Sequence, residues 1–290
     1  MEVGILDKAI ENLFQYRSNR DKLTKKIQEH PEQVVTTMDA DELTGVAVFW
    51  EKSLHPNAVY IDLITSYDVS SKSKVYAELY EKVMEKIANT VGRKNIHIEI
   101  SPTKRGLIDF CKQNGFKRFR FSFNTYLNLS FFENREKKTT GKVYTLRELK
   151  RNLQLLAEFL CILEENYEET HRNNPLKEMN QEEWLEFLFQ ENPVVDVPAV
   201  LVKGGHVASY AVCFELEETK EPVLSWVGTE GKDQESLFEL MFLLGDSLLE
   251  KGYKKLFGRF ETTDEDAMYV LGNFPFEEKP MRAMYQKKMN

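Results

Sequence analysis

The segment from Asn57 to Ala88 decides how the chain is organised, and it reads NAVYIDLITSYDVSSKSKVYAELYEKVMEKIA. Its first part, Ala58 to Thr65, is β-branched and aromatic with a period of two, which predicts a strand. Four residues that cap helix N-termini follow: Ser66, Asp68, Ser70 and Ser71. Apolar residues at four-residue spacing then predict a helix with one buried stripe: Val75, Leu79, Val83 and Ile87. A strand that leads into a capped helix start gathers free backbone N–H groups, which suit an anion such as a pyrophosphate, although most such turns bind nothing.

Length and composition limit the class of protein. At 290 residues the chain has room for two domains or one large one. Its 42% hydrophobic and 12% aromatic residues are enough for a sizeable core, which excludes general disorder. The three cysteines fit neither a disulfide framework nor a zinc site, which indicates a reducing compartment and no bound metal. Because the sequence shows neither a signal peptide nor an apolar run of about 18 residues, we expect a soluble cytoplasmic protein with no membrane partner.

Charge is unevenly distributed along the chain. Residues 1–140 hold 22 Lys and Arg against 19 Asp and Glu, whereas residues 141–290 hold 17 against 28. The acidic second half either has well-solvated helices or favours a cationic ligand. No basic stripe stands out in either half, so we expect no nucleic-acid partner.

The first half of the chain predicts a mixed α/β layer with helices on both faces. The elements expected around the opening segment are a helix over 4–28, a hairpin over 34–50, a strand over 96–100, a helix over 104–113 that stops at Asn114-Gly115, and one or two strands over 116–129. Residues 133–142 are charged, contain glycine and lack apolar side chains, so they are the predicted linker.

The second half repeats the same element order without evident residue identity. Its expected elements are helices over 146–168 and 181–189, a hairpin over 199–216 that turns at Gly204-Gly205, a strand over 223–228, a helix over 235–250, a strand over 255–260, a helix over 264–271 and a strand over 281–287. We therefore expect an α/β (α+β) protein with two tandem domains of one fold, 1–132 and 143–290, each a mixed and mostly antiparallel sheet flanked by helices.

This order, found twice, resembles the GNAT (Gcn5-related N-acetyltransferase) superfamily. The most specific local match is FCKQNGF at Phe110–Phe116, which is similar to the family's closing helix with the pattern F-Y-x-x-x-G-F. AMYVLGNFPF at Ala267–Phe276 is a weaker match, and the first copy lacks the family's usual first strand. The resemblance implies an acyl-CoA-dependent N-acyltransferase that transfers acetyl from acetyl-CoA to a small amine or a peptide amine. The resemblance is also compatible with a homodimer.

The resemblance also implies where the cosubstrate binds. In the family, the thioester arm lies where two neighbouring strands splay apart, and a turn with the pattern R/Q-x-x-G-x-G/A receives the pyrophosphate at a helix N-terminus. The residues expected along pantetheine are Leu63, Ile64, Thr65 and Ser66. Those expected at the pyrophosphate are Ser71, Lys72, Ser73, Lys74, Val75 and Tyr76. Lys74 and Tyr76 replace the family's glycines, but the matching turn of the second half carries Asp233 and Glu235, so the first half is favoured for CoA.

Transfer of an acyl group to an amine needs a base for the ammonium proton, donors for the oxyanion and an acid for the departing thiolate. The base candidates are Asp62 on the third strand and Glu99 on the next, where His97 shares the face of Glu99. Cys111 stands where the family has a tyrosine acid, and a buried structural thiol is the alternative for this residue.

The sequence leaves more than one function open. The first is the N-acetyltransferase implied by the resemblance. The alternative is a catalytically inactive tandem binding or assembly module, which the glycine-poor turns and the missing tyrosines favour. An aminoacyl-tRNA-using transferase on the same doubled fold is a weaker third, because the chain is short and shows no basic arm.

Overall fold

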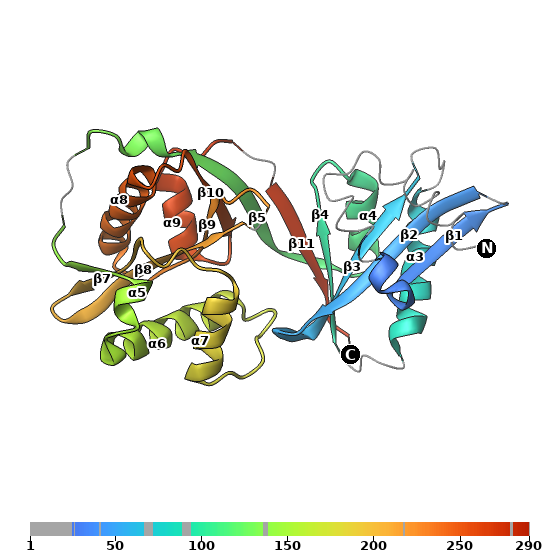
Figure 1. Cartoon of the computed structure of the whole chain (residues 1–290). Helices are drawn as coiled ribbons and strands as arrows, with labels where there is room; N and C mark the ends of the chain where they lie inside the picture. The colour runs from blue at the N-terminus through green and yellow to red at the C-terminus, as the bar shows by residue number, and fades with distance from the viewer. Residues whose placement is uncertain are drawn as a thin grey trace. The chain divides into compact units, whose positions relative to one another are not determined.

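The structure of the protein is a computed structural model of the chain (Figure 1), and it describes residues 25, 27–40, 42–66, 72–88, 94–135, 139–216, 218–278 and 281–289. The chain forms two compact units. The first unit comprises Met1–Phe119, Asn174–Lys177 and Arg282–Asn290, and the second comprises Arg120–Asn173 and Glu178–Met281. None of the helices in the described ranges is long and apolar enough to cross a membrane.

The boundaries of the two compact units differ from those of the expected domains, 1–132 and 143–290. The four residues Asn174–Lys177 of the second half belong to the first unit, and so does the C-terminal strand from Arg282. The backbone N–H of Lys177 donates to the carbonyl of Leu54, and the amide of Asn174 donates to the hydroxyl of Tyr60 at 2.6 Å. The linker at 133–142 stays a prediction about where the chain divides into independently folding parts.

The first unit has a five-stranded sheet with the order β1-β2-β3-β4-β11. Its described elements are η1 (Pro31–Gln33), β1 (Val34–Asp39), β2 (Glu42–Lys52), β3 (His55–Thr65), α3 (Lys72–Ala88), β4 (Asn95–Ile100), α4 (Arg105–Gln113) and β11 (Met281–Lys287). Strands β1, β2 and β3 are antiparallel, β3 and β4 are parallel, and β11 is antiparallel to β4. The helix expected over 4–28 lies almost entirely outside the described residues.

Helix α3 covers one face of this sheet with the stripe that the sequence predicts. All four stripe residues, from Val75 to Ile87, are buried. Gly45 of β2 lies beneath the helix, where an added Cβ would come within 2.6 Å of Val75 and 2.9 Å of Leu79. The glycine therefore lets the helix approach the sheet closely, and the predicted strand–helix unit is confirmed.

The second unit has a six-stranded sheet with the order β5-β10-β9-β8-β7-β6. Its elements are β5 (Lys117–Asn128), η2 (Leu129–Phe132), β6 (Lys142–Thr145), α5 (Leu146–Leu149), α6 (Leu153–Thr170), α7 (Gln181–Gln190), β7 (Pro198–Lys203), β8 (His206–Glu215), β9 (Pro222–Thr229), α8 (Gln234–Glu250), β10 (Lys255–Glu261) and α9 (Glu265–Asn273). Strands β9 and β10 are parallel, and the other neighbours are antiparallel. The range 146–168 holds two helices, α5 and α6, and the range 116–129 holds one strand, β5.

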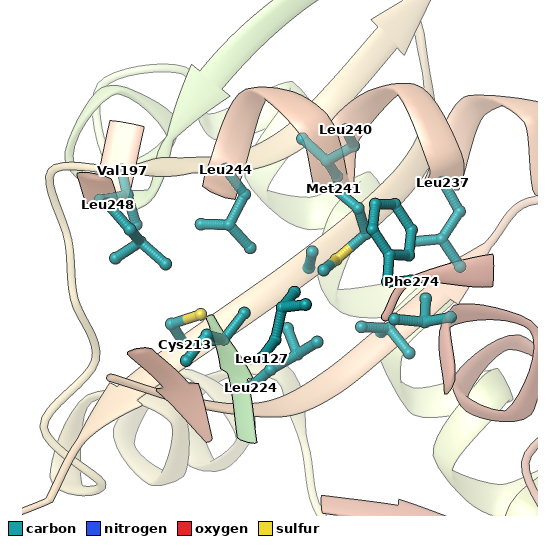
Figure 2. Packing of buried hydrophobic residues seen from close by; sticks show 14 of the residues in the cluster. Leu127, Val197, Cys213, Leu224, Leu237, Leu240, Met241, Leu244, Leu248 and Phe274 are labelled. Atoms are coloured by element: carbon teal, nitrogen blue, oxygen red, sulfur yellow. The ribbon is translucent and has the colours of Figure 1, made fainter. Parts of the chain in front are cut away.

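Helix α8 supplies most of the core of the second unit (Figure 2). Five of its apolar residues are fully buried over the sheet: Leu237, Leu240, Met241, Leu244 and Leu248. They meet Leu127, Cys213 and Leu224 from three different strands. Each buried side chain of this size contributes about 1.5–3 kcal/mol, so this layer holds the sheet rigidly in place.

Candidate functional site

In the first unit, strands β3 and β4 are paired at one end only. Their parallel register runs over three pairs and ends at Tyr60↔His97. Strand β3 nevertheless continues to Thr65, still paired with β2, and β4 continues to Ile100, still paired with β11. Among the described residues, the facing edges of these two strand ends have no ladder between them. The sheet of the first unit therefore has a gap at the place where the resemblance to the GNAT superfamily implies one.

Two of the predicted catalytic residues flank this gap on one face of the sheet. The rings of Tyr60 and His97 lie edge to face, with centroids 5.3 Å apart, so both side chains occupy the same face. Side chains two residues further along a strand share that face. Asp62 and Glu99 therefore take matching positions on the two diverging strands. Asp62 is partly buried, and exposed Glu99 accepts a hydrogen bond from Arg282 Nη1 of β11 at 3.2 Å.

Cys111, the predicted acid, lies elsewhere. It is fully buried on α4, beside Tyr80 of α3, and burial raises the pKa of its thiol to about 12. Helix α3 covers the face opposite to Asp62, because Gly45, which points at α3, is paired with Thr65. The structure thus brings Asp62 and Glu99 together but does not bring Cys111 to them.

The residues expected along pantetheine form the end of β3. The side chains of Leu63 and Ile64 are buried, whereas Thr65 and Ser66 are partly exposed. Ser66 N–H donates to the carbonyl of Thr44 at 2.9 Å. Because the two apolar side chains belong to the core, only the main chain of this strand end is suited to line a ligand.

The residues expected at the pyrophosphate form the start of α3, except Ser71, which lies outside the described residues. Lys72 is partly buried, Ser73 and Lys74 are exposed, and the first turn of α3 holds no acidic residue. Val75 and Tyr76 are buried, and the Tyr76 ring packs on Phe110 with centroids 6.0 Å apart. The helix start therefore combines the positive end of the dipole with two lysines.

The second unit has the equivalent gap, and here a β-bulge accompanies it. Strands β9 and β10 are paired only at Phe257↔Val223 and Gly258↔Leu224. On the other edge of β9, Trp226 faces Val212 and Leu224 faces Cys213, so Ser225 has no partner on β8. A bulge disrupts the ladder and turns a strand away from its neighbour. The bulge therefore falls where β9 and β10 part.

A cavity of about 220 Å³ occupies this second gap. Its walls come from α6, from Tyr210 of β8, from β9 at Ser225–Val227, from Arg259 and Glu261 of β10, and from the start of α9. The α6 residues in the wall are Leu163, Asn166, Tyr167 and Thr170, and His171 joins them from the C-cap of the helix. The cavity is thus lined by elements of one unit.

Two aspartates lie at the start of α9, and one of them, Asp264, is part of the cavity wall. Asp264 caps α9 by accepting from Ala267 N–H at 2.8 Å, and burial raises its pKa to about 7, helped by the charges of Asp266 and Glu261. Asp266 accepts from Thr229 Oγ1 at 2.8 Å, and burial raises its pKa as well. Sequence reasoning missed both aspartates. One feature of the sequence could have indicated Asp264: it stands where a helix cap is expected, directly after the strand at 255–260.

The start of α8, in contrast, is occupied by the chain's own carboxylate. Asp233 accepts from Ser236 N–H at 3.1 Å and from the Ser236 hydroxyl, and these bonds hold its pKa below the usual range. Lys232 pairs with Glu265 at 2.7 Å, and Glu235 lies in the first turn of α8. A phosphate at this helix start would meet carboxylates, which repel it.

Gly228 shapes one wall of the cavity and provides a test of its packing. An added Cβ would overlap the amide of Asn166 and lie 2.5 Å from the Tyr210 ring. Overpacking of this kind costs about 1–3 kcal/mol, so Gly228→Ala is expected to lower the free energy of unfolding by that amount in urea denaturation. Gly272→Ala on α9 is the control, because no atom lies within 4 Å of its added Cβ. Equal stability of Gly228→Ala and the wild type would contradict this packing.

Each unit has a sheet with the same parallel strand pair, and this pair opens at one end beside the start of a helix. Two such sheets define a tandem GNAT fold, and solved structures have the same fold. A GCN5-related N-acetyltransferase from Sphaerobacter thermophilus is similar over 98% of this chain and 91% of its own, with a TM-score of 0.61 at 11% identity. A tandem GNAT protein from the clavulanic acid biosynthesis pathway is similar over 99% and 96%, with a TM-score of 0.58 at 9% identity. The expected fold class is confirmed, and identities this low show the fold alone. No family model and no curated protein matches the sequence.

Proposed function

We propose that the protein is an acyl-CoA-dependent N-acyltransferase that transfers acetyl from acetyl-CoA to an amine, with the cosubstrate bound in the first unit. One observation carries this proposal. Strands β3 and β4 part beyond Tyr60↔His97, directly before a helix start that carries Lys72 and Lys74 and no acid in its first turn. Unpaired strand edges offer main-chain donors and acceptors to an extended arm, and the helix start attracts its phosphates.

The residues of the first unit fit acetyl-CoA in separate ways. The main chain of Leu63, Ile64, Thr65 and Ser66 would hold the pantetheine arm. Ser71, Lys72, Ser73 and Lys74, with the backbone of Val75 and Tyr76, would hold the pyrophosphate. Acetyl-CoA supplies the acyl group as a thioester. Asp62 and Glu99, on the face opposite to α3, would remove a proton from the ammonium of the acceptor, because only the neutral amine is nucleophilic.

Cys111 fits the role of acid for the thiolate less well than a structural role. The thiol is fully buried in the layer between α3 and α4, and its raised pKa of about 12 reflects that burial. Full turnover by Cys111→Ala would remove the thiol from the mechanism.

The second unit is less suited to acetyl-CoA, for an electrostatic reason. Its cap Asp233 already occupies the helix start at which a pyrophosphate would bind. Lys232, at the family's R/Q position, is engaged by Glu265.

A catalytically inactive tandem module is the second candidate function. Tyr76 is buried at the position of the family's second glycine, where the backbone of a CoA-binding turn approaches the phosphates. Acetyl-CoA binding without transfer to any amine of a chemically varied panel would favour this candidate.

Calorimetry with acetyl-CoA tests the proposed site. We expect micromolar binding that Lys74→Glu weakens about 10- to 100-fold, because the substitution replaces an attractive charge at the helix start with a repulsive one. Lys112→Glu makes the same change of charge in the last turn of a different helix, α4, and is expected to bind like the wild type. If acetyl-CoA does not bind at millimolar concentration, or if both variants bind equally, the site is wrong.

A further inference from the structure

The cavity of the second unit is small and largely aromatic. Its volume of about 220 Å³ equals the liquid volume of about seven water molecules, so it suits a ligand with few non-hydrogen atoms. Tyr167 stacks on His171, with ring centroids 4.0 Å apart and planes 8° from parallel, and meets Trp226 edge to face at 6.3 Å. Buried Tyr210 closes the wall beside Asn166. Aromatic faces of this kind attract cations.

The polar end of the cavity consists of acceptors. An ionised carboxylate accepts about four hydrogen bonds. Asp264 receives the backbone N–H groups of Ala267 and Asp266, and Asp266 receives the hydroxyl and backbone N–H of Thr229. The Asp264 carboxylate in the cavity wall therefore has acceptor capacity left for a ligand, and an ammonium group has three donors.

The remaining charged and titratable groups around the cavity do not cancel this acidic end. They are Glu261 and Arg259 of β10, Tyr167 of α6, His171 at the C-cap of α6 and Tyr210 of β8. Glu261 is engaged by Arg120 of β5. Arg259 is exposed at the rim, where water and salt screen its charge. Asp264 is thus the carboxylate that a ligand inside the cavity meets.

We infer that this cavity binds a small organic ammonium ion with an apolar body, as a site independent of acyl transfer in the first unit. The ammonium group would lie at Asp264, whose carboxylate also feels the charge of neighbouring Asp266, and the apolar body would lie against Tyr167 and Trp226. The acidic helix start at Asp233 repels the phosphates of CoA from this gap. The gap between β9 and β10 therefore suits a cationic ligand better than the anionic CoA.

Calorimetry on the full chain at pH 8, without acyl-CoA, tests this inference with benzylammonium as the probe. We expect saturable binding at least about tenfold tighter than that of benzyl alcohol, which has the same shape without the charge, and no binding of benzoate. Equal affinity for the alcohol, or no binding of benzylammonium up to about 10 mM, would overturn the inference.

Variants place the ligand within the second unit. Asp264→Asn is expected to bind benzylammonium about tenfold more weakly, and asparagine keeps the cap of α9. Asp266→Asn keeps an acceptor for Thr229 and changes a charge outside the cavity wall, so it is expected to weaken binding less than Asp264→Asn. Glu265→Gln on the same helix also lies outside the cavity wall and should bind like the wild type, as should Lys74→Glu of the first unit. Unchanged affinity in Asp264→Asn would show that the ligand binds elsewhere.

The pH dependence of binding gives an independent readout. Benzylammonium stays charged from pH 5.5 to 8, whereas Asp264 takes up a proton as the pH falls through about 7. We expect the affinity to fall below pH 7 by up to about tenfold in all, the same loss as in the neutral Asp264→Asn, and this pH dependence should vanish in that variant. A flat profile in the wild type would contradict the assignment of the ammonium to Asp264.

Discussion

A chain that ends at Glu278 is expected to lose the fold of the first unit and to keep that of the second. The deletion removes β11, whose residues Ala283, Met284 and Tyr285 are buried in the first unit. Strand β11 pairs with β4 over five positions, and the amide of Gln286 lies 3.0 Å from Nε2 of buried His97. Two large buried side chains at about 1.5–3 kcal/mol each, with the ladder hydrogen bonds, amount to about 5 kcal/mol or more. That is a large part of the stability of a domain.

Hydrogen exchange resolved by peptide measures this loss in each unit separately. We expect backbone protection to disappear in β1–β4 and α3 and to persist in β7–β10 and α8. A chain that ends at Lys287 keeps β11 and should be protected like the wild type. Met284→Ala, which leaves a cavity beside Ala58 and Tyr60, should destabilise the first unit alone by about 2–5 kcal/mol. Full protection of β3 and β4 in the chain that ends at Glu278 would contradict the assignment of β11 to the first unit.

Local pattern was enough to predict most elements of the fold. The stripe of α3 is fixed by four-residue spacing, and β11 begins and ends at the residues that the sequence predicts. Gly115 has a positive φ of 80°, which ends α4 as the Asn-Gly pair indicates. These features depend on residues that are neighbours in the chain, and so a single sequence contains them.

Pairing between distant segments could not be predicted in the same way. The strand at 281–287 was expected in the second domain, but it pairs with β4 of the first unit. Its alternation of side chains specifies a strand with a buried face and not the strand that lies beside it. The short β6, Lys142–Thr145, was not predicted either, because four residues give no period.

The same limit applies to the two sites. Period two places Glu99 and His97 on one face, but only the register Tyr60↔His97 shows that Asp62 matches Glu99 across the gap. Asp264 is far in sequence from the cavity walls that α6, β8 and β9 supply. It becomes part of a site through the bulge at Ser225 and the end of the β9–β10 ladder, which no local pattern specifies.

Asp264→Asn is expected to stabilise the protein at pH 8. An aspartate has an ordinary pKa of 3.8, and burial raises that of Asp264 to about 7 in the folded state. Between these values the folded state keeps a proton that the unfolded state has released, so stability falls as the pH rises and is lowest above about 7. Three pKa units at about 1.4 kcal/mol each set a cost of about 4 kcal/mol, which the neutral amide avoids. Asparagine also caps α9, so the substitution removes the charge without removing the cap.

Urea denaturation of both chains at several pH values measures this difference. Near pH 4 both forms of residue 264 are neutral in the folded state, and the free energies of unfolding should nearly coincide. The advantage of Asp264→Asn should then grow through pH 5 and 6 and level off above about pH 7. Glu265→Gln on the exposed side of α9 removes a carboxylate without burial and should show no such growth. A difference that does not change with pH would mean that Asp264 is solvated in the folded protein.

The charge of Asp264 affects both the stability of the protein and the binding of a cation. Measuring the two together shows whether Asp264 belongs to a ligand site or is only a buried helix cap. If the buried charge serves a bound ammonium ion, benzylammonium at 100 times its wild-type Kd should stabilise the wild type at pH 8 by about 2.7 kcal/mol. The same concentration should stabilise Asp264→Asn by only about 1.4 kcal/mol, because the variant binds about tenfold more weakly. The ligand would thereby restore most of what the unpaired carboxylate removes. If the charge serves no ligand, the substitution still stabilises the protein, but benzylammonium changes neither chain. The buried aspartate would then be a defect of the fold that the cavity tolerates.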